Sequence, residues 1–178
     1  SRKGEYKELV QLSAIKIKIN QNNISIIDEF SEYCIPSINS NLSKYFTELT
    51  GITNNTINNL GVNFNKLIEN FYNFSKEYKC FCYGSKLGND SHILIENMDL
   101  NKNKNQNILN WIHNNHFDIR PLFQGVIDTQ NYNSGNLYKA FNLKIDTNIV
   151  KEHNSLWDVK SQFYCLQYLF NNNKNILL

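Results

Sequence analysis

The hydrophobic pattern at the start of the chain predicts a β-hairpin. Across residues 15–19, three isoleucines alternate with two lysines, which is the period-two pattern of a strand with one buried face. The earlier part of this stretch, from residue 8, is apolar at neighbouring positions, as in a strand covered on both faces. A polar turn at 21–23 then leads to a second expected strand over 24–35, which Pro36 ends.

Helix-capping residues and helical spacing organise the middle of the chain. Short helices are expected over 42–49, closed by Gly51, and over 53–60, with Thr53 as the cap and Gly61 as the stop. Asn63 opens a longer helix with an apolar face. The remaining expected elements are a strand over 80–83 with Phe81 packed inward, helices over 90–98, 108–113 and 120–126, a short strand over 117–119, and a helix over 135–141 capped by Ser134.

The C-terminal region predicts one long helix, because apolar residues recur at three-to-four spacing from Val159 to Phe170. Ser155 is a natural N-cap, which would place Asp158 at the third helical position. His153 and Asp158 are five residues apart, so within one ideal helix their side chains would point to different faces. If His153 lies in the preceding loop, both side chains can point into one cleft.

Two interpretations of this stretch stay open from its residues alone. Ser155 followed by Asp158 has the spacing of a capping box, so Asp158 could serve only to satisfy backbone N–H groups, with His153 an ordinary loop histidine. Alternatively, the two residues form part of a reactive site. The order of elements, strands first and then helices alternating with short strands, indicates a layered α/β or α+β domain.

Composition and charge narrow the possible domain organisation and partners. The chain has 178 residues, of which 41% are hydrophobic, so one globular domain over 1–170 with a frayed tail at 171–178 is expected. A net charge of +2 argues against a highly basic nucleic-acid arm but leaves room for a local basic patch. No apolar stretch has the length of a membrane span, so no membrane partner is expected.

The four cysteines do not form a recognisable metal motif. Cys80 and Cys82 would point the same way on a strand, but no second pair completes a zinc site. Buried free thiols are therefore expected, which indicates a cytoplasmic location. His113 and His116 are three residues apart and could suggest a metal pair, but their asparagine-rich surroundings favour a solvated loop.

Several short motifs occur in an order that resembles a known enzyme family. They are the run Leu49-Thr50-Gly51-Ile52-Thr53, the helix start Gly88-Asn89-Asp90, Glu96-Asn97, the run from Ser134 to Phe141, and the stretch from Glu152 to Asp158. Together they are similar to the DEDDh 3′→5′ exonucleases of the RNase H-like fold, in the branch of the Eri1-type and KapD-like proteins. The resemblance extends from Glu5 to Phe170.

This resemblance implies a role for each matching residue. His153 would be the general base, Asp158 and Asp90 would be metal ligands, and residues Leu49 to Ile52 would grip the 3′-terminal nucleotide. Two divalent cations, Mg²⁺ or Mn²⁺, would be the cofactors, because carboxylate oxygens suit hard cations and phosphodiester hydrolysis needs charge neutralisation and an activated water. From the residues alone, Asp90 could equally be a helix N-terminal acid, Gly51 a left-handed C-cap and Ile52 core.

One family motif has no counterpart in the sequence. The first motif, Asp-x-Glu on the central strand, would precede Glu5, and neighbouring Asp28 and Glu29 cannot replace it because adjacent strand residues point to opposite faces. We therefore expect a mixed β-sheet flanked by helices that lacks its first central strand. Asp90 and Asp158 should lie together beside His153, and an open slot should border the strand over 9–19.

The sequence thus predicts a metal-dependent 3′→5′ exonuclease acting on single-stranded RNA or DNA ends. Two alternatives remain: a proofreading-type DNA exonuclease subunit, and a catalytically silent nucleic-acid- or protein-binding module on the same fold. The upstream residues discriminate between them, because a strand carrying Asp-x-Glu favours an enzyme.

Overall fold

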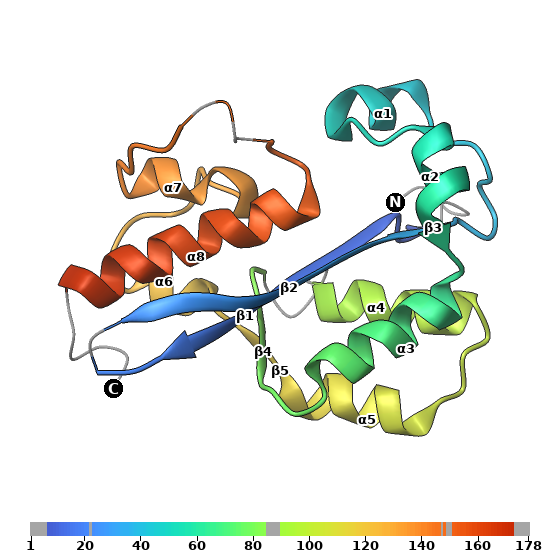
Figure 1. The fold of residues 1–178 in the computed structure, drawn as a ribbon, viewed down its shortest axis with the longest axis horizontal. Coiled ribbons are helices and arrows are strands. Elements are labelled where there is room, and N and C mark those ends of the chain that lie inside the picture. Colours follow the sequence, from blue (N-terminus) through green and yellow to red (C-terminus); the bar gives the residue numbers. More distant parts are fainter. Residues whose placement is uncertain (1–6, 22, 85–89, 147, 149–150, 173–178) are drawn as a thin grey trace.

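A long antiparallel hairpin runs through the middle of the fold (Figure 1). The computed structural model describes residues 7–21, 23–84, 90–146, 148 and 151–172. The strands of the hairpin are β1 (Gln11–Ile19) and β2 (Ile24–Cys34), paired in a register that sets Ala14 opposite Phe30. The register shifts at Lys16 and Ile17, as in a β-bulge. The hairpin expected from the alternating pattern is confirmed.

The strands form two separate sheets. β3 (Gly61–Val62) pairs in parallel with the end of β2, giving the order β1-β2-β3. β4 (Cys80–Cys82) and β5 (His116–Asp118) form a parallel pair of their own. Among the described residues, no ladder joins β1 to β4, so the predicted mixed α/β architecture is present with its sheet divided between these two strands.

Helices cover both faces of the hairpin (Figure 1). On one side lie α6 (Arg120–Gln124), the single turn η1 (Ser134–Asn136), α7 (Leu137–Ala140) and α8 (Ser155–Asn172). On the other side lie α3 (Phe64–Ser75), α4 (Asp90–Leu100) and α5 (Gln106–Asn115). The two short helices α1 (Lys44–Thr50) and α2 (Asn54–Leu60) stand at one end.

This layering produces two apolar cores with the hairpin between them. One core gathers around α8 and receives Ile15 and Ile17 from β1, whereas the other gathers around α3 and receives Leu12 and Ala14. Because neighbouring strand residues point to opposite faces, β1 is covered from both sides. That arrangement agrees with the expectation drawn from its consecutive apolar residues.

Most of the predicted caps are present. The side chains of Thr53 and Asn63 accept the backbone N–H three residues on, at Thr56 and Lys66, as N-caps do. Gly51 ends α1 in the left-handed region at φ 73°, a conformation that glycine adopts without a Cβ penalty. Gly61 ends α2 in an extended conformation, which leads directly into β3.

Three local predictions were wrong. The cap before η1 is Asn133, whose side chain forms a reciprocal capping box with Asn136, and not Ser134. Phe81 does not pack inward but is 58% exposed, where its ring lies against that of Phe117. His116 is not in a solvated loop, because it lies half-buried in β5 against Trp111.

Residues 88–89 of the expected helix start and 173–178 of the expected tail lie outside the described residues, and α8 continues to Asn172. All four cysteines are free thiols. A search of the described helices finds none that is both long enough and apolar enough to cross a membrane.

Candidate active site

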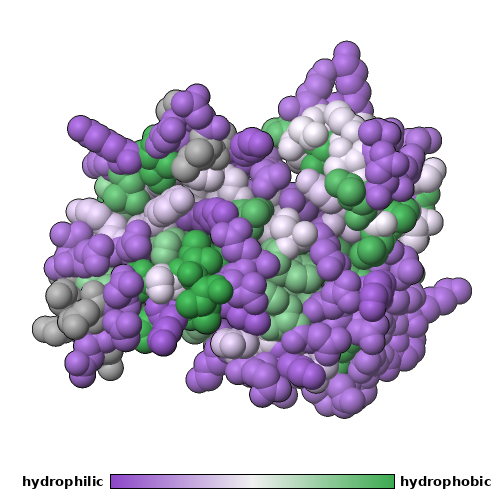
Figure 2. All heavy atoms as spheres, in the orientation of Figure 1, coloured by the Kyte–Doolittle hydropathy of each residue, from purple (hydrophilic) through white to green (hydrophobic). Residues whose placement is uncertain are grey.

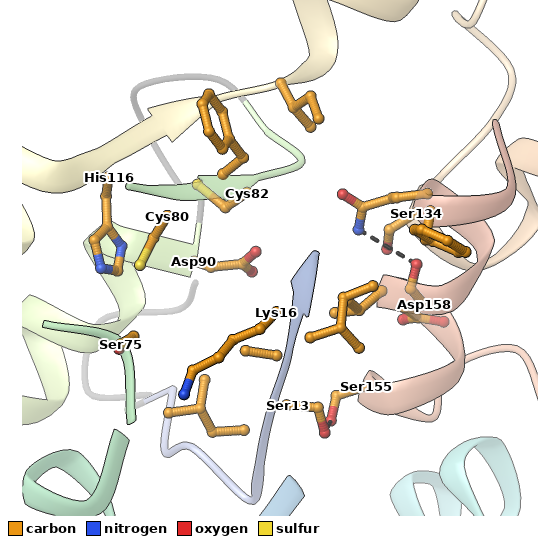
Figure 3. Close-up of a pocket in the computed structure, with 18 of the residues that line it drawn as sticks. Ser13, Lys16, Ser75, Cys80, Cys82, Asp90, His116, Ser134, Ser155 and Asp158 are labelled. Atoms are coloured by element: carbon orange, nitrogen blue, oxygen red, sulfur yellow. Dashed lines mark hydrogen bonds between the residues drawn. The ribbon is translucent and has the colours of Figure 1, made fainter. Parts of the chain in front are cut away.

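A groove of about 580 Å³ lies where the sheet is divided, bordered by β1 on one side and β4 on the other. Helices α3 and α4 supply one wall and α8 supplies the opposite wall. Apolar surface shows in the middle of the molecular face in Figure 2, between flanks that are mostly hydrophilic. In Figure 3, Asp90 enters the groove from one side, and Ser134 and Asp158 lie on the other.

The first turn of α8 resolves the question that the sequence left open about Asp158. Asn154, not Ser155, is the N-cap: its side-chain oxygen accepts the backbone N–H groups of Leu156 and Trp157, and its carbonyl accepts that of Asp158. Asp158 is therefore at the fourth helical position, beyond the capping box. The Ser155 hydroxyl instead meets the Ser13 hydroxyl of β1 at 2.6 Å, which fixes the start of α8 to the hairpin.

The Asp158 carboxyl group is held in the groove without a full set of partners. The Ser134 side chain and the His153 backbone lie close enough to lower its pKa, but its buried Oδ1 atom has no hydrogen-bond partner. The pKa of Asp158 is raised to about 6, chiefly by desolvation and in smaller part by the negative charge of Asp90, against the lowering effects of His153 and Ser134. A carboxylate in such surroundings is one that a cation would stabilise.

Asp90 is one of two further acidic groups that line the groove; the other, Asp118 of β5, accepts the backbone N–H of Arg120 at 2.8 Å. Asp90 is the first residue of α4, and its side chain is exposed toward the open space of the groove. The surrounding protein nevertheless desolvates its carboxyl group and raises its pKa. The charge of Asp90 raises the pKa of Asp158, and both residues line the groove; that they form one catalytic site stays a prediction.

His153 lies in the loop before α8, as predicted, and its side chain is exposed. Its backbone has φ 68°, a left-handed conformation that few residues other than glycine adopt. Such conformations persist where the surrounding structure requires them, and here the turn places the His153 backbone where it lowers the pKa of the Asp158 carboxyl group. His153 is thus near Asp158, although it is not part of the groove lining.

Gly135 is a site residue that the pattern of the sequence did not single out. A Cβ atom at this position would collide with the Asp158 carboxylate, so only glycine allows the close approach. The Gly135 carbonyl also accepts the indole N–H of Trp157 at 2.7 Å, which prevents the η1 turn from moving away. The only signal in the sequence was the Ser134-Gly135 pair within a family-like motif.

We expect Gly135→Ala to displace the Asp158 carboxyl group and to lower both activity and stability, the latter by about 1–3 kcal/mol for an overpacked site. Gly125→Ala is the matched control. An added Cβ there meets its nearest atom, a backbone oxygen, at 3.5 Å, and the residue already has right-handed helical angles. Urea unfolding of both variants checks the prediction, and equal stabilities would contradict it.

The run from Leu49 to Ile52 divides into two kinds of residue. Ile52 is only 4% exposed, and the Thr50 hydroxyl bonds back to the Phe46 carbonyl and accepts the Ile52 N–H, so both belong to the end of α1. The expectation that Ile52 wedges against a nucleotide is therefore replaced by a core role. Leu49 is 39% exposed and is the apolar side chain of the run that is open to solvent.

The pair Ile52→Ala and Leu49→Ala tests this division. Truncating buried Ile52 should cost about 2–5 kcal/mol of stability, because the change leaves a cavity. Truncating exposed Leu49 should leave the melting temperature close to that of the parent and raise KM for short substrates. Thermal melts and initial rates on both proteins decide the matter; a stable Ile52→Ala protein would show that Ile52 is not part of the core.

The far end of the groove has a different chemistry. Cys80, Cys82 and His116 line it (Figure 3), and burial raises the thiol pKa values and lowers the pKa of His116 to about 4. These groups are therefore neutral near pH 7. The His116 Nδ1 atom lies 3.1 Å from the Ser91 hydroxyl.

Asp28 and Glu29 point in different directions on β2, as strand geometry requires. Asp28 pairs with Lys16 of β1 at 3.3 Å, whereas Glu29 pairs with Lys160 of α8 at 2.9 Å. Neither carboxylate lines the groove, so this acidic pair does not supplement Asp90 and Asp158.

The chemistry of Asp90 and Asp158, two of the three carboxylates that line the groove, fits a hard divalent cation. Asp158 has a buried oxygen without a donor, and its like-charged neighbour Asp90 makes a cation favourable between them. The described residues contain no group of three or more His, Cys, Asp or Glu side chains placed to hold a metal ion.

Comparisons with known proteins agree with this geometry. The RNase_T family, described as exonuclease, matches residues 2–166. The nuclease domain of 3′hExo, described as a DEDDh family member bound to rAMP, has a similar structure with a TM-score of 0.73 and 18% identity, over 93% of this chain and 82% of that one. No curated protein sequence matches.

Two further solved structures are similar. A full-length 3′-exonuclease gives a TM-score of 0.68 at 19% identity, over 93% of this chain and 54% of that one. A 3′-exonuclease described in 3′-end-specific recognition of a histone mRNA stem-loop gives 0.65 at 15% identity, over 94% and 84%. The RNase H-like mixed α/β fold predicted from the sequence is confirmed, and the chain belongs to the RNase_T exonuclease family.

Proposed function

We propose that the protein removes nucleotides from the 3′ ends of single-stranded RNA or DNA, with two bound Mg²⁺ or Mn²⁺ ions and His153 as the general base. The observation that carries this proposal is the Asp158 carboxyl group. It is released from helix capping and lies in the groove beside Asp90 and His153, with one buried oxygen unsatisfied.

Divalent cations, when bound, neutralise charge on the attacked phosphate and lower the pKa of a coordinated water. Asp158 and Asp90 would hold them as carboxylate ligands. Ser134 and the backbone of His153, which both lower the pKa of Asp158, would help to orient its carboxylate, and Gly135 gives it room. These contacts preorganise the group, which lowers the cost of ordering it when substrate binds.

His153 would accept the proton that the attacking water loses. Histidine suits this role because its ordinary titration lies near neutral pH. An exposed ring on a loop, anchored through its own backbone to Asp158, can approach a phosphate bound at the mouth of the groove. Leu49, exposed at the end of α1, would contact the terminal nucleotide.

RNA is the first substrate to test. Two of the similar structures are described with RNA components, a bound rAMP and a histone mRNA stem-loop. These descriptions concern those proteins and support RNA as a substrate of this one. A proofreading-type DNA exonuclease would instead prefer DNA.

The test incubates the purified protein with single-stranded RNA and DNA, each labelled at the 5′ end or the 3′ end, with Mg²⁺, Mn²⁺ or chelator. We expect 5′-labelled strands to shorten progressively and 3′-labelled strands to release a labelled mononucleotide at once, only with metal. Binding without cleavage in either metal would favour the silent binding module and overturn the proposal.

A further inference from the structure

The loop that carries His153 is joined to α7 by an ion pair. The Lys139 Nζ and Glu152 Oε1 atoms lie 2.6 Å apart, which makes this the shortest ion pair among the described residues. The two residues are 13 apart in sequence, and Glu152 lies directly before His153. The hydrogen bond to Glu152 raises the pKa of Lys139, so the lysine is charged near neutral pH. The pair thus connects two separate segments through opposite charges.

Helix α7 gives Lys139 a fixed position. Three of the four residues of α7 are buried, and the fourth, Lys139, points outward. The Tyr138 backbone N–H donates to the Ser161 hydroxyl of α8 at 3.4 Å, and the Tyr138 ring packs edge-on against that of Trp157. Helix α7 is therefore fixed against α8, the helix that the His153 loop leads into (Figure 1).

On its C-terminal side, His153 is held by the start of α8. The Asn154 side chain caps that helix, and the Asn154 backbone N–H donates to the Lys151 carbonyl at 2.9 Å. His153 itself has a left-handed backbone at φ 68°. A residue with a Cβ atom keeps this conformation only where neighbouring contacts hold it. The pair of Lys139 with Glu152 supplies such a contact on the N-terminal side of His153.

We propose that Lys139 is a positioning residue, which fixes the His153 loop through Glu152 and so keeps the imidazole close to Asp158. This role depends on the proposed function, in which His153 accepts the proton of the attacking water. Neither Lys139 nor Glu152 would touch the reacting atoms. A base that is displaced by about 1 Å loses much of its contribution to the rate, even where substrate still binds. Loss of the pair should therefore lower kcat and leave KM nearly unchanged.

A direct contact between Lys139 and a substrate phosphate is the competing role. Two observations favour the positioning role: the lysine is already bonded to a carboxylate, and it is not part of the groove lining. Glu152→Gln distinguishes the two roles. It would free a phosphate-binding lysine and so lower KM, whereas it would release a loop that depends on the pair and so lower kcat.

Cleavage kinetics on single-stranded RNA test the proposal. We expect Lys139→Met, Glu152→Gln and the double variant each to lower kcat about tenfold, with KM changed by less than about twofold. The double variant should lose no more than the single ones, because the two residues act as one unit. Lys104→Met is the matched control, since that lysine forms an ion pair with Asp99 at 3.8 Å outside the groove lining. Its kcat should equal that of the parent.

Restoring the pair should restore turnover. Lys139→Arg keeps the positive charge and should retain about half of the parent kcat or more. Exchanging the charges, with Lys139→Glu and Glu152→Lys in one protein, should recover most of the loss. An unchanged kcat in the single variants would overturn the proposal. A KM that rises in Lys139→Met and falls in Glu152→Gln would also overturn it, in favour of a phosphate contact.

A measurement that needs no cleavage separates this role from the nuclease function. The heteronuclear NOE of the His153 and Asn154 amides reports motion of the loop on the picosecond-to-nanosecond timescale. Its value should fall in Lys139→Met and Glu152→Gln, with the Trp111 amide in α5 unchanged as the internal reference. Equal values in parent and variants would overturn the proposal in an active or an inactive protein. A fall in the variants of a parent that cleaves neither RNA nor DNA would support the anchoring of the loop and overturn only the proposed function.

Discussion

Asp158→Asn is expected to lower turnover about 10²–10⁴-fold without lowering the melting temperature. Asparagine has the shape of aspartate but carries no charge, so a cation at the site loses a ligand worth several kcal/mol of transition-state stabilisation, and about 1.36 kcal/mol corresponds to each factor of ten in rate. Because the N-cap is Asn154, the substitution removes no cap from α8. Asp99→Asn is the control, since that carboxylate is 77% exposed on α4.

The stability of Asp158→Asn should also differ from the parent in its pH dependence. The folded-state pKa of Asp158 is raised from 3.8 to about 6, so its protonated form stabilises the fold below pH 3.8, and this stabilisation is lost as pH rises through 6. The difference between the folded-state and unfolded pKa values of Asp158 corresponds to a change of at most about 3 kcal/mol in the free energy of unfolding. With chelator present, urea unfolding at pH 4 and pH 7 should show this loss in the parent and not in the variant. A variant that retained full turnover would show that Asp158 is not part of the catalytic site.

The architecture was predictable because its signals are local. Alternating isoleucines and lysines specify the hairpin, and Thr53 and Asn63 mark helix starts through hydrogen bonds within one turn. The choice between neighbouring cap residues was not predictable in this way. Asn154 and Ser155 are both good N-caps, and Ser155 is used instead to bond Ser13, which is 142 residues away in sequence.

The candidate site was likewise predictable only where signals local in the sequence, or the family resemblance, pointed to it. Asp90, Asp158 and His153 were grouped in one predicted site only through the resemblance, since no local pattern links residues so far apart; of the three, Asp90 and Asp158 line the groove. The sequence missed Gly135, whose importance depends on how closely η1 approaches α8, and it left Ile52 open between a nucleotide contact and the core. Both outcomes depend on tertiary packing, which periodicity does not encode.

The proposed role of His153 as the general base gives a second prediction with a large expected effect. His153→Ala should lower turnover about 10²–10⁴-fold, the usual contribution of a general base. Folding should be little affected, because the His153 side chain is exposed. Alanine in a left-handed conformation does add some strain, so His153→Asn, a residue that tolerates these angles, is the second variant to measure. His113→Ala, at an exposed histidine on α5, is the control.

Two further measurements distinguish a proton acceptor from a residue that only shapes the loop. Added imidazole should restore part of the turnover of His153→Ala, because it can occupy the vacated space and accept the proton. The fall in rate on the acid side of the parent pH profile should also disappear in the variant. If His153 merely holds the turn that places its backbone against Asp158, imidazole should have no effect, and His153→Asn should be as active as the parent.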